Sequence, residues 1–460
     1  MSAQDPGKNP AQDPAEVRRH MEQLAADGID VVRVTYPDLI GTERARDVLL
    51  EELPRAVEHG LAFCRAVYHT SPQGDVVPVA GGLDAGLPDI CVRPDLSTLA
   101  ALPWEPGVAT CLAEVVDPAT GAPAPESPRD LLRSVLDRCA DHGLRPVVGP
   151  ELEYFLCEPD PAGGWRRYGA VPGVVYTAGL RADPDNHLLR TLRQVRGLDI
   201  GVLSGNHEFD GGQFEINLLH SAALPAADRA FRFKSAIKEL ARQEGRLATF
   251  MAKPFNDAGG SGFHLHLSCE TTDDRGVHNA FDDPRGAYGL SATARHAVAG
   301  VLAHAPALAA LLNPTVNSYK RFGPDTLAPW LIDWGLDNRS AMVRIPPERG
   351  SGARLELRLA DASANPYLAI AATAAAALLG VLAGEEPPAP LEGYGYDTTK
   401  ASLLPTGLSA ALDALEADTD LAELLGKDFI TSYVTYKRDE LERFGRHVTD
   451  WEFTEYAYHL

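Results

Sequence analysis

The stretch Gly149-Pro150-Glu151-Leu152-Glu153-Tyr154-Phe155 decides how the rest of this sequence is interpreted. Its apolar and aromatic residues, continued on both sides by further apolar residues, predict a buried strand. Side chains alternate between the two faces of a strand, so Glu151 and Glu153 point the same way and Leu152 points opposite. Two neighbouring carboxylates in an apolar frame repel each other and lose solvation, so they need a shared proton or a cation. A solvated acidic face on an edge strand is the alternative that this stretch alone leaves open.

Composition is that of an ordinary soluble globular protein. The chain has 460 residues, of which 45% are hydrophobic and 23% charged, so it can bury a large core and is expected to form two domains. The net charge of −22 argues against a nucleic-acid or anionic-membrane binder, because both need a basic surface. Six scattered cysteines without a Cys-x-x-Cys pair indicate reduced thiols in a cytoplasmic protein rather than disulfides or a thiolate zinc site.

Turn and helix signals divide the chain into a tail and two domains. Residues 1–14 are polar and proline-rich without an apolar h-region, so we expect a flexible tail and not a signal peptide. Short strands with few helices predict a small α+β domain over 15–118, and the proline-rich stretch 117–128 marks its boundary. Residues 124–460 mix helices and strands and form the expected larger domain.

Hydrophobic periodicity predicts individual elements. Helices are expected at 15–27, 51–60, 226–244, 291–310, 365–384, 408–415 and 435–448. Strands or extended segments are expected at 31–36, 63–68, 108–116, 214–218, 263–268 and 354–359, with a further short segment at 41–50. The uncharged, alanine-rich stretch 367–384 is too weakly apolar to insert strongly in a membrane, so we expect a buried helix of a large domain.

Two further motifs carry groups that suit metal or phosphate binding. His207-Glu208-Phe209-Asp210-Gly211-Gly212-Gln213-Phe214-Glu215 places two glutamates on either side of a Gly-Gly turn, which can bring them together as a hairpin would. A glycine-rich loop at 258–262 leads into a strand with His264 and His266 on one face. Glycines permit close backbone approach to a ligand, and paired histidines suit a metal or a phosphate. A His-x-His strand taken alone is more often structural or on the surface.

Arginines gather in the last third of the chain. They occur in Asn338-Arg339-Ser340, at Arg344 and in Arg354-Leu355-Glu356-Leu357-Arg358. Arginines at this density near glutamates suit polyphosphate and carboxylate binding. Hard oxygen ligands with an imidazole favour Mg²⁺ or Mn²⁺ over zinc. Together with the glycine-rich loop, these groups predict phosphoryl transfer.

In this order the motifs resemble those of the type I glutamine synthetase family, from near Ala25 to the C-terminus. The matching words are Gly-Pro-Glu-Leu-Glu-Tyr-Phe (149–155), Gly-Gly-Gln-Phe-Glu (211–215), Gly-Ser-Gly-Phe-His-Leu-His-Leu-Ser (260–268), Asn-Pro-Thr-Val-Asn-Ser-Tyr-Lys-Arg (313–321), Asn-Arg-Ser (338–340), Arg-Ile-Pro (344–346), Arg-Leu-Glu-Leu-Arg (354–358) and Ala-Asn-Pro-Tyr (364–367). The resemblance implies an α+β fold. A small N-terminal β-grasp-like domain would precede a large catalytic domain that has a curved antiparallel sheet and helices.

The resemblance also implies an active site with two ions of Mg²⁺ or Mn²⁺ and ATP. It assigns one ion to Glu153, Glu208 and Glu215, and the other to Glu151, His264 and Glu356. It assigns the nucleotide to His266 and Ser268, and the nucleotide phosphates to Arg339, Arg344 and Arg354. It assigns glutamate to Gly259 and Gly260, although the family usually has Asn where Gly259 stands, and to Arg321 and Arg358.

The implied reaction joins the γ-carboxylate of L-glutamate to an amine. ATP phosphorylates the carboxylate, and the amine attacks the γ-glutamyl phosphate, so that ADP and phosphate are released. The metals would neutralise the phosphoryl oxygens. Arginines, with Arg321 and Arg339 as the expected catalytic pair, would stabilise charge on the transferring group.

Two positions depart from the ammonia-using members. Their flap reads Pro-Gly-Tyr-Glu-Ala-Pro, and its glutamate helps to bind and deprotonate ammonium. The equivalent stretch here is Phe322-Gly323-Pro324-Asp325-Thr326-Leu327-Ala328-Pro329. Its Ala-Pro fixes the alignment and puts Leu327 at the position of that glutamate. A second ammonium ligand, an aspartate, falls near Cys64, where no acid occurs. Because a small hydrated cation needs anionic ligands, we expect an organic amine such as a polyamine, ethanolamine or an alkyl or aryl amine. Substitution by Asp325 or another nearby acid is the alternative.

Two other functions are compatible with the same motifs. An ordinary glutamine synthetase with a rearranged ammonium site is one alternative, and a non-catalytic family member is another, against which the complete metal and arginine sets argue. The resemblance implies a dodecamer of two stacked hexameric rings with shared active sites, in which Trp451 to Leu460 would be an exchanged contact arm. Tyr396 lacks the Leu-Pro-Pro that follows the family's nucleotidylated tyrosine, so we expect an unmodified tyrosine in a surface loop.

Overall fold

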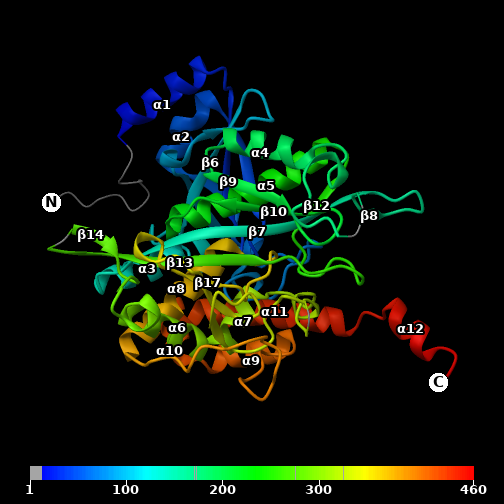
Figure 1. Ribbon diagram of the computed structural model, residues 1–460. Coiled ribbons are helices and arrows are strands. Elements are labelled where there is room, and N and C mark those ends of the chain that lie inside the picture. The colour runs from blue at the N-terminus through cyan, green and yellow to red at the C-terminus, as the bar shows by residue number, and fades with distance from the viewer. Residues whose placement is uncertain (1–12, 170, 172, 275, 325) are drawn as a thin grey trace.

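The computed structural model describes residues 13–169, 171, 173–274, 276–324 and 326–460. These residues form two sheets with helices packed against them (Figure 1). The tail expected at 1–14 lies outside the described residues, apart from Asp13 and Pro14. Asp13 accepts a hydrogen bond as the cap of the first helix, and Pro14 begins that helix, where its missing N–H has no cost.

The smaller sheet is built from the N-terminal part of the chain. Its order is β2-β1-β6-β4-β3, with β5 on β6, and β1 runs parallel to β6. The strands are β1 (Val31–Pro37), β2 (Glu43–Leu49), β3 (Leu61–Cys64), β4 (Asp89–Pro94), β5 (Ala100–Ala101) and β6 (Val108–Val116). Helices α1 (Pro14–Ala26) and α2 (Leu53–His59) contribute Val17, Leu24 and Val57 to its core.

The extended segment expected at 63–68 is wrong beyond Cys64. The chain turns into a 3-10 helix at Arg65–His69. Arg65 at this turn forms an ion pair with the buried carboxylate of Glu126, and the Arg65 N–H bonds to the Pro88 carbonyl at 2.9 Å. These long-range contacts outweigh the local preference of the apolar residues for a strand.

The larger sheet has eleven strands, and the opening stretch lies at its centre. Its order is β15-β16-β17-β13-β7-β10-β9, with β8, β11 and β12 on β7 and β14 on β13. The strands are β7 (Arg145–Pro159), β8 (Trp165–Arg167), β9 (Val202–His207), β10 (Gln213–Leu218), β11 (Ser221–Ala222), β12 (Leu247–Thr249), β13 (Phe263–Asp273), β14 (Gly276–Asn279), β15 (Trp334–Leu336), β16 (Val343–Ile345) and β17 (Leu355–Leu357). The edge-strand alternative is therefore wrong, because β7 is paired on both sides.

Ten further helices follow the smaller sheet among the described residues. They are α3 (Pro128–Asp141), α4 (His187–Gly197), α5 (Ala223–Gln243), α6 (Ala292–Ala303), α7 (Ala305–Leu312), α8 (Pro366–Ala383), α9 (Leu408–Ala417), α10 (Thr419–Leu425), α11 (Lys427–Gly445) and α12 (Asp450–Tyr456). The single helix expected at 291–310 is wrong, because α6 and α7 meet at an angle of 74°. Pro306, in the first turn of α7, lacks the N–H that a continuous helix would need.

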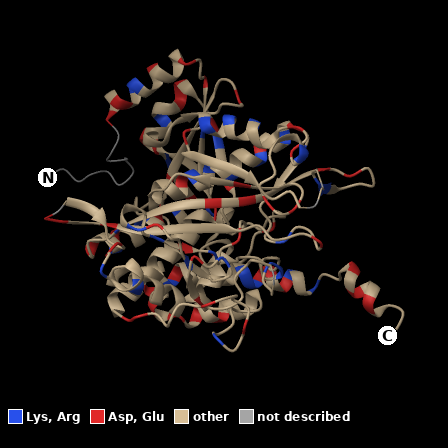
Figure 2. Ribbon diagram, viewed as in Figure 1, with Lys and Arg blue, Asp and Glu red and all other residues tan. Residues whose placement is uncertain are grey.

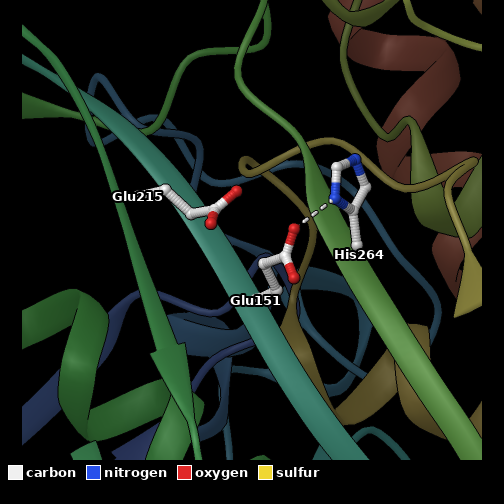
Figure 3. Close-up of side chains that lie close together, drawn as sticks. All are labelled: Glu151, Glu215 and His264. Carbon is white, nitrogen blue, oxygen red and sulfur yellow. Dashed lines mark hydrogen bonds and ion pairs between the residues drawn. The ribbon is translucent and has the colours of Figure 1, made fainter. Parts of the chain in front are cut away.

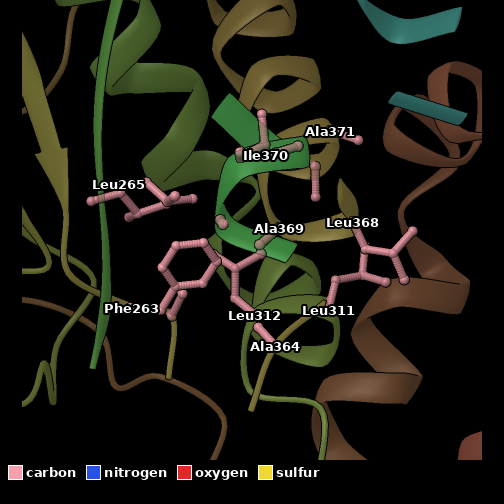
Figure 4. Packing of buried hydrophobic residues seen from close by; sticks show 14 of the residues in the cluster. Phe263, Leu265, Leu311, Leu312, Ala364, Leu368, Ala369, Ile370 and Ala371 are labelled. Atoms are coloured by element: carbon pink, nitrogen blue, oxygen red, sulfur yellow. The ribbon is translucent and has the colours of Figure 1, made fainter. Parts of the chain in front are cut away.

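Helix α8 is the centre of the main core. It is long and apolar enough to cross a membrane, but 78% of it is buried inside the fold, as expected for a core helix. Figure 4 shows Leu368 of α8 beside Leu311 of α7, and Ala369 of α8 beside Leu312 of α7 and Phe263 of β13. The side of β13 that faces this core is therefore apolar, and its histidines lie on the other side.

Two glycines allow α8 to touch α6 through the backbone. A Cβ on Gly380 would lie 2.1 Å from the carbonyl oxygen of His296 and 2.5 Å from the nitrogen of Gly300. A Cβ on Gly300 would lie 2.2 Å from the carbonyl oxygen of Ala376. No side chain fits at either position without moving one helix away from the other.

We predict that Gly380→Ala destabilises the fold by at least about 2 kcal/mol, because the added methyl group must displace a backbone segment. The loss is measured as a lowered melting temperature. Gly445→Ala, at the end of α11, is the matched control because its Cβ would meet nothing within 4 Å. A Gly380→Ala protein as stable as the wild type would contradict the close helix crossing.

Candidate functional site

The two faces of β7 have different chemistry. Leu152 and Tyr154 belong to the main core, where the Tyr154 ring lies 6.5 Å from that of Phe233 in α5. Glu151 and Glu153 lie on the opposite face, as alternation along the strand requires. Figure 2 shows acidic positions in the middle of this strand, between uncharged residues.

The neighbouring strands add ligands at the same level of the sheet. His264 of β13 is opposite Glu151, and Glu215 of β10 is opposite Glu153. One ligand atom from each of Glu151, Glu215 and His264 lies within 4.8 Å of the others (Figure 3). The resemblance assigns Glu215 to one ion and the other two residues to a second, whereas the structure brings all three into one group.

Glu151 holds both histidines of the His-x-His strand. His264 Nδ1 lies 2.9 Å from Glu151 Oε1, and His266 Nε2 lies 3.3 Å from Glu151 Oε2. Burial favours the neutral carboxyl, but the contacts with His264 and His266 outweigh it and lower the pKa of Glu151 well below its ordinary value. Glu151 is therefore an anion between two imidazoles.

The second carboxylate of β7 lies beside the glycine-rich loop. Glu153 Oε2 accepts hydrogen bonds from the Gly262 N–H at 2.8 Å and from Gln213 Nε2 at 3.1 Å. Glu208, which follows β9, accepts one from Asn206 at 2.9 Å. The hairpin expected from the Gly-Gly turn is confirmed, because β9 and β10 pair antiparallel around it.

The carboxyl groups of Glu208 and Glu215 have raised pKa values. Burial, and then the negative charge of Glu153, raises the pKa of Glu208. Burial, and then Glu151 and Glu153, raises the pKa of Glu215. Burial and like charge thus disfavour the ionised form of both carboxyl groups, and a cation between them would remove that penalty. The donor set of carboxylates and one imidazole suits Mg²⁺ or Mn²⁺.

Glu356 differs from the other candidate ligands because it is already paired. Its carboxylate accepts bonds from Arg344 Nη1 at 2.5 Å and Arg358 Nη1 at 2.6 Å, and it lies 4.0 Å from His264 Nδ1. Burial opposes ionisation, but Arg358 and the histidines lower the pKa of Glu356 to about 2. It is placed to join an ion bound at His264.

The glycine-rich loop lies against Arg321. A Cβ on Gly260 would lie 2.5 Å from Arg321 Cγ, and one on Gly262 would lie 3.0 Å from Arg321 Nη2. The Gly259 N–H donates to Asp210 Oδ2 at 2.5 Å. The loop needs glycines because any larger residue would displace this buried arginine.

The arginines differ in what they already bind. Arg321 donates to the Leu359 carbonyl at 3.2 Å. Arg344 donates to Asp337, and Arg354 Nε donates to His266 Nδ1 at 3.1 Å. Arg339 is exposed at the surface. Arg358 Nε is buried and has no hydrogen-bond partner among the described residues.

The remaining candidates lie apart from this group. Ser268 is two residues beyond His266 on the same face of β13. Leu327 lies in an exposed turn. Cys64 ends β3 in the smaller sheet, where its thiol lies 3.8 Å from the Leu87 carbonyl. Asp325 lies outside the described residues.

Three residues at the site were missed by sequence analysis. Gln213 and Asn206 hold Glu153 and Glu208 through their side-chain amides, and the only signal is their position beside the acidic motif. Tyr176 is 71% exposed with a φ of 53°, and Glu208, Glu215 and Glu151 contribute to its raised pKa after burial. A single aromatic residue in a loop gives no periodic signal.

Comparisons with known proteins agree with this geometry. The family model "Glutamine synthetase, catalytic domain" matches residues 125–456. The glutamine synthetase of Methanocaldococcus jannaschii is 34% identical over 453 residues, covering 96% of this chain and 98% of that protein. That of Thermotoga maritima is 33% identical over 456 residues, covering 96% of this chain and 99% of that protein.

Solved structures show the same fold. A GmaS/ADP complex superposes with a TM-score of 0.84 at 34% identity, covering 95% of this chain and 99% of that chain. GmaS without ligand gives a TM-score of 0.82 at 34% identity, covering 97% and 100%. A protein described as a novel glutamine synthase homolog gives 0.79 at 27% identity, covering 92% and 97%.

Fold, site and comparisons together define an ATP-dependent ligase of the kind that uses a divalent metal. The chain belongs to the glutamine synthetase family.

We predict that the protein, once treated with a chelator, binds Mn²⁺, and that His264→Ala weakens this binding at least about tenfold, because one ligand and its charge balance are lost. Binding is measured calorimetrically without substrates. It tightens as pH rises, because the cation displaces protons from Glu208 and Glu215. His142→Ala, an exposed histidine at the end of α3, is the control. Unchanged Mn²⁺ affinity in His264→Ala would refute the metal site.

Proposed function

We propose that this protein is an ATP-dependent ligase that joins the γ-carboxylate of L-glutamate to an organic amine through γ-glutamyl phosphate. The proposal rests on three supports: the acidic face for divalent ions, the arginines around the glycine-rich loop, and the apolar turn at Leu327. Alkyl amines, ethanolamine and polyamines are the substrate classes to be distinguished.

The observation that carries the amine proposal is the conformation of Leu327. Its φ of 58° lies in the left-handed region, and its side chain is 40% exposed. A leucine in this conformation costs roughly 1–2 kcal/mol, and such strain concentrates at functional sites. The turn presents an apolar side chain where ammonia-using relatives would need a carboxylate. Apolar contact favours a substrate that carries carbon over a small hydrated cation.

The GmaS structures support the same choice. GmaS is a gamma-glutamylmethylamide synthetase, so its product contains an organic amine, and two of its structures match nearly the whole chain. A methylamine-sized or larger alkyl amine is accordingly the first candidate.

The chain's own residues would bind and orient the reactants. Bound divalent ions would neutralise the phosphate oxygens of ATP. Glu151, Glu215 and His264 would hold the cation, while Gln213 and the Gly262 N–H fix the orientation of Glu153. Arg339, which is exposed, can reach an entering nucleotide without breaking a buried ion pair.

Glutamate would bind at the glycine-rich loop. Arg358 Nε and Ser261 Oγ are buried and without partners among the described residues. A buried donor without a partner costs about 1–3 kcal/mol, and a substrate carboxylate would supply the missing acceptor. Arg321 adds a second positive charge beside Gly260 and Gly262.

We further propose a homo-oligomer with shared active sites. The resemblance puts Cys64 at the amine site, but Cys64 belongs to the smaller sheet and the acidic face to the larger one. In a shared site, the smaller sheet of one subunit would complete the acidic face of its neighbour. Helix α12 extends away from the rest of the chain (Figure 1), and its Trp451 and Phe453 are 63% and 73% exposed. Apolar side chains on an extended arm are typical of a segment that another subunit covers.

Ammonia use is the second candidate, and the names of the relatives favour it. The Methanocaldococcus jannaschii and Thermotoga maritima proteins are both glutamine synthetases. A non-catalytic family member is disfavoured, because every candidate metal ligand and arginine is present.

We predict glutamate- and Mg²⁺-dependent phosphate release from ATP with at least one organic amine, measured with ammonia, methylamine, ethanolamine and putrescine. The best amine should exceed ammonia in kcat/KM at least about tenfold, because the ammonium ligand at position 327 is replaced by an apolar side chain. Ammonia that is turned over as efficiently as any amine would refute the proposal. No turnover with any of the four would favour the non-catalytic alternative.

We predict that Leu327→Glu shifts the ratio of kcat/KM for ammonia to that for the preferred amine at least about tenfold toward ammonia, since it restores an anionic ligand. The matched control is Leu382→Glu, which changes a similarly exposed leucine at the end of α8. An unchanged ratio in a folded Leu327→Glu protein would count against the role of this turn.

A further inference from the structure

The segment Gly393-Tyr394-Gly395-Tyr396 is a motif that the proposed reaction has not used. Tyr394 is 52% exposed, whereas Tyr396 is half-buried and its hydroxyl is hydrogen-bonded. Tyr396 lies in a loop, as expected, and its hydroxyl group is anchored there by the hydrogen bond. The two rings contact each other edge to face at 4.7 Å.

One side of this segment is bonded to the residues that flank Arg339. Asn338 Nδ2 donates to the Gly393 carbonyl at 2.6 Å, and the Gly395 N–H donates to Ser340 Oγ at 2.8 Å. The Ser340 hydroxyl in turn donates to Asn338 Oδ1 at 2.7 Å. Arg339 lies between the two bonded residues, so this segment fixes the backbone that presents the exposed guanidinium.

Gly395 is required for this close approach. A Cβ at this position would lie 2.8 Å from the Ser340 carbonyl oxygen and 3.0 Å from Ser340 Oγ. Any other residue would push the segment away from Ser340, because the nearest atom belongs to the backbone.

The other side of the segment is bonded to the turn that carries Leu327. The Tyr396 hydroxyl donates to the Ala328 carbonyl at 3.0 Å. Ala328 is buried, and its N–H bonds to Thr326 Oγ1 at 3.3 Å, so the backbone on either side of Leu327 is held in place. Tyr396 is also near enough to Arg321 to contribute to the electrostatics of that guanidinium.

We propose that Tyr396 is a positioning residue for the amine: its hydroxyl holds the Leu327 turn in place, and the segment 393–396 links that turn to Asn338 and Ser340 on the nucleotide side. The inference rests on the proposed function, because it assigns Leu327 to the amine site. Tyr396 itself does not touch the reacting atoms. Its hydrogen bond to Ala328 fixes the strained leucine, and the Ser340 relay makes that position depend on the backbone around Arg339.

The test is Tyr396→Phe, which removes only the hydroxyl group. The KM for the amine should rise about fivefold, the equivalent of one neutral hydrogen bond, while kcat and the KM for ATP stay within about twofold. Phosphate released per amide formed should increase, because a loosely held turn leaves the acyl phosphate open to water. A melting temperature close to that of the wild type shows that the fold is intact.

Two further variants separate positioning from structure. Tyr394→Phe, the same change on the neighbouring ring, should leave the KM for the amine unchanged, because the hydrogen bond to Ala328 comes from Tyr396. Gly395→Ala should raise the KM for ATP as well as for the amine, because it moves the segment away from Ser340. An unchanged amine KM and an unchanged ratio of phosphate to amide in Tyr396→Phe would overturn the proposal.

Failure of the proposed function would look different. If the wild type prefers ammonia, the amine assignment fails in the wild-type protein before any variant is measured. The Tyr396→Phe comparison is then made with ammonia, and an unchanged ammonia KM would overturn the positioning role separately.

Discussion

The architecture of the site depends on the need to neutralise carboxylates on one face of β7. Glu151 and Glu153 are brought together by a strand whose other face is committed to the core, so neither can move to that face without losing its polar partners. Their partners are imidazoles beside Glu151 and backbone and amide donors around Glu153, and arginines surround the nearby Glu356. Glu208 and Glu215 each accept a hydrogen bond from one asparagine amide but have no ion pair among the described residues, and a divalent ion there would complete the balance.

The carboxyl groups around this face fall into two classes, one with lowered and one with raised pKa values. Glu151 and Glu356 are held as anions, whereas burial and neighbouring charge favour protons on Glu208 and Glu215. The arginines also differ. Arg344 donates to the carboxylates of Asp337 and Glu356. Arg358 donates to Glu356 as well, but its buried Nε has no partner among the described residues. The face thus combines carboxyl groups whose charge a cation would balance with a buried donor that an anion would satisfy.

Much of this site could be predicted because its residues lie on strands and tight turns, whose geometry follows from the local sequence. Alternation along β7 and β13 fixed the faces of Glu151, Glu153, His264 and His266, and the Gly-Gly turn fixed the hairpin of Glu208 and Glu215. Prediction failed where long-range contacts decide the backbone. The turn after Cys64 is held by the ion pair of Arg65 with Glu126, and Tyr176 and Tyr396 reach their positions through loops without any periodic pattern. The grouping of Glu215 with Glu151 and His264 depends on side-chain conformations, which motifs do not specify.

The glycine crossing of α6 and α8 has a consequence for how this enzyme can change. Two helices that touch through their backbones form one rigid block behind the sheet, with little freedom to slide or to accept larger side chains. The strands that pack on this block are held in place with it, so we expect the positions of the acidic side chains to tolerate little change. Exposed turns, such as the one that carries Leu327, are where a residue can be exchanged with little effect on the fold. The chain separates what must stay constant from what can evolve.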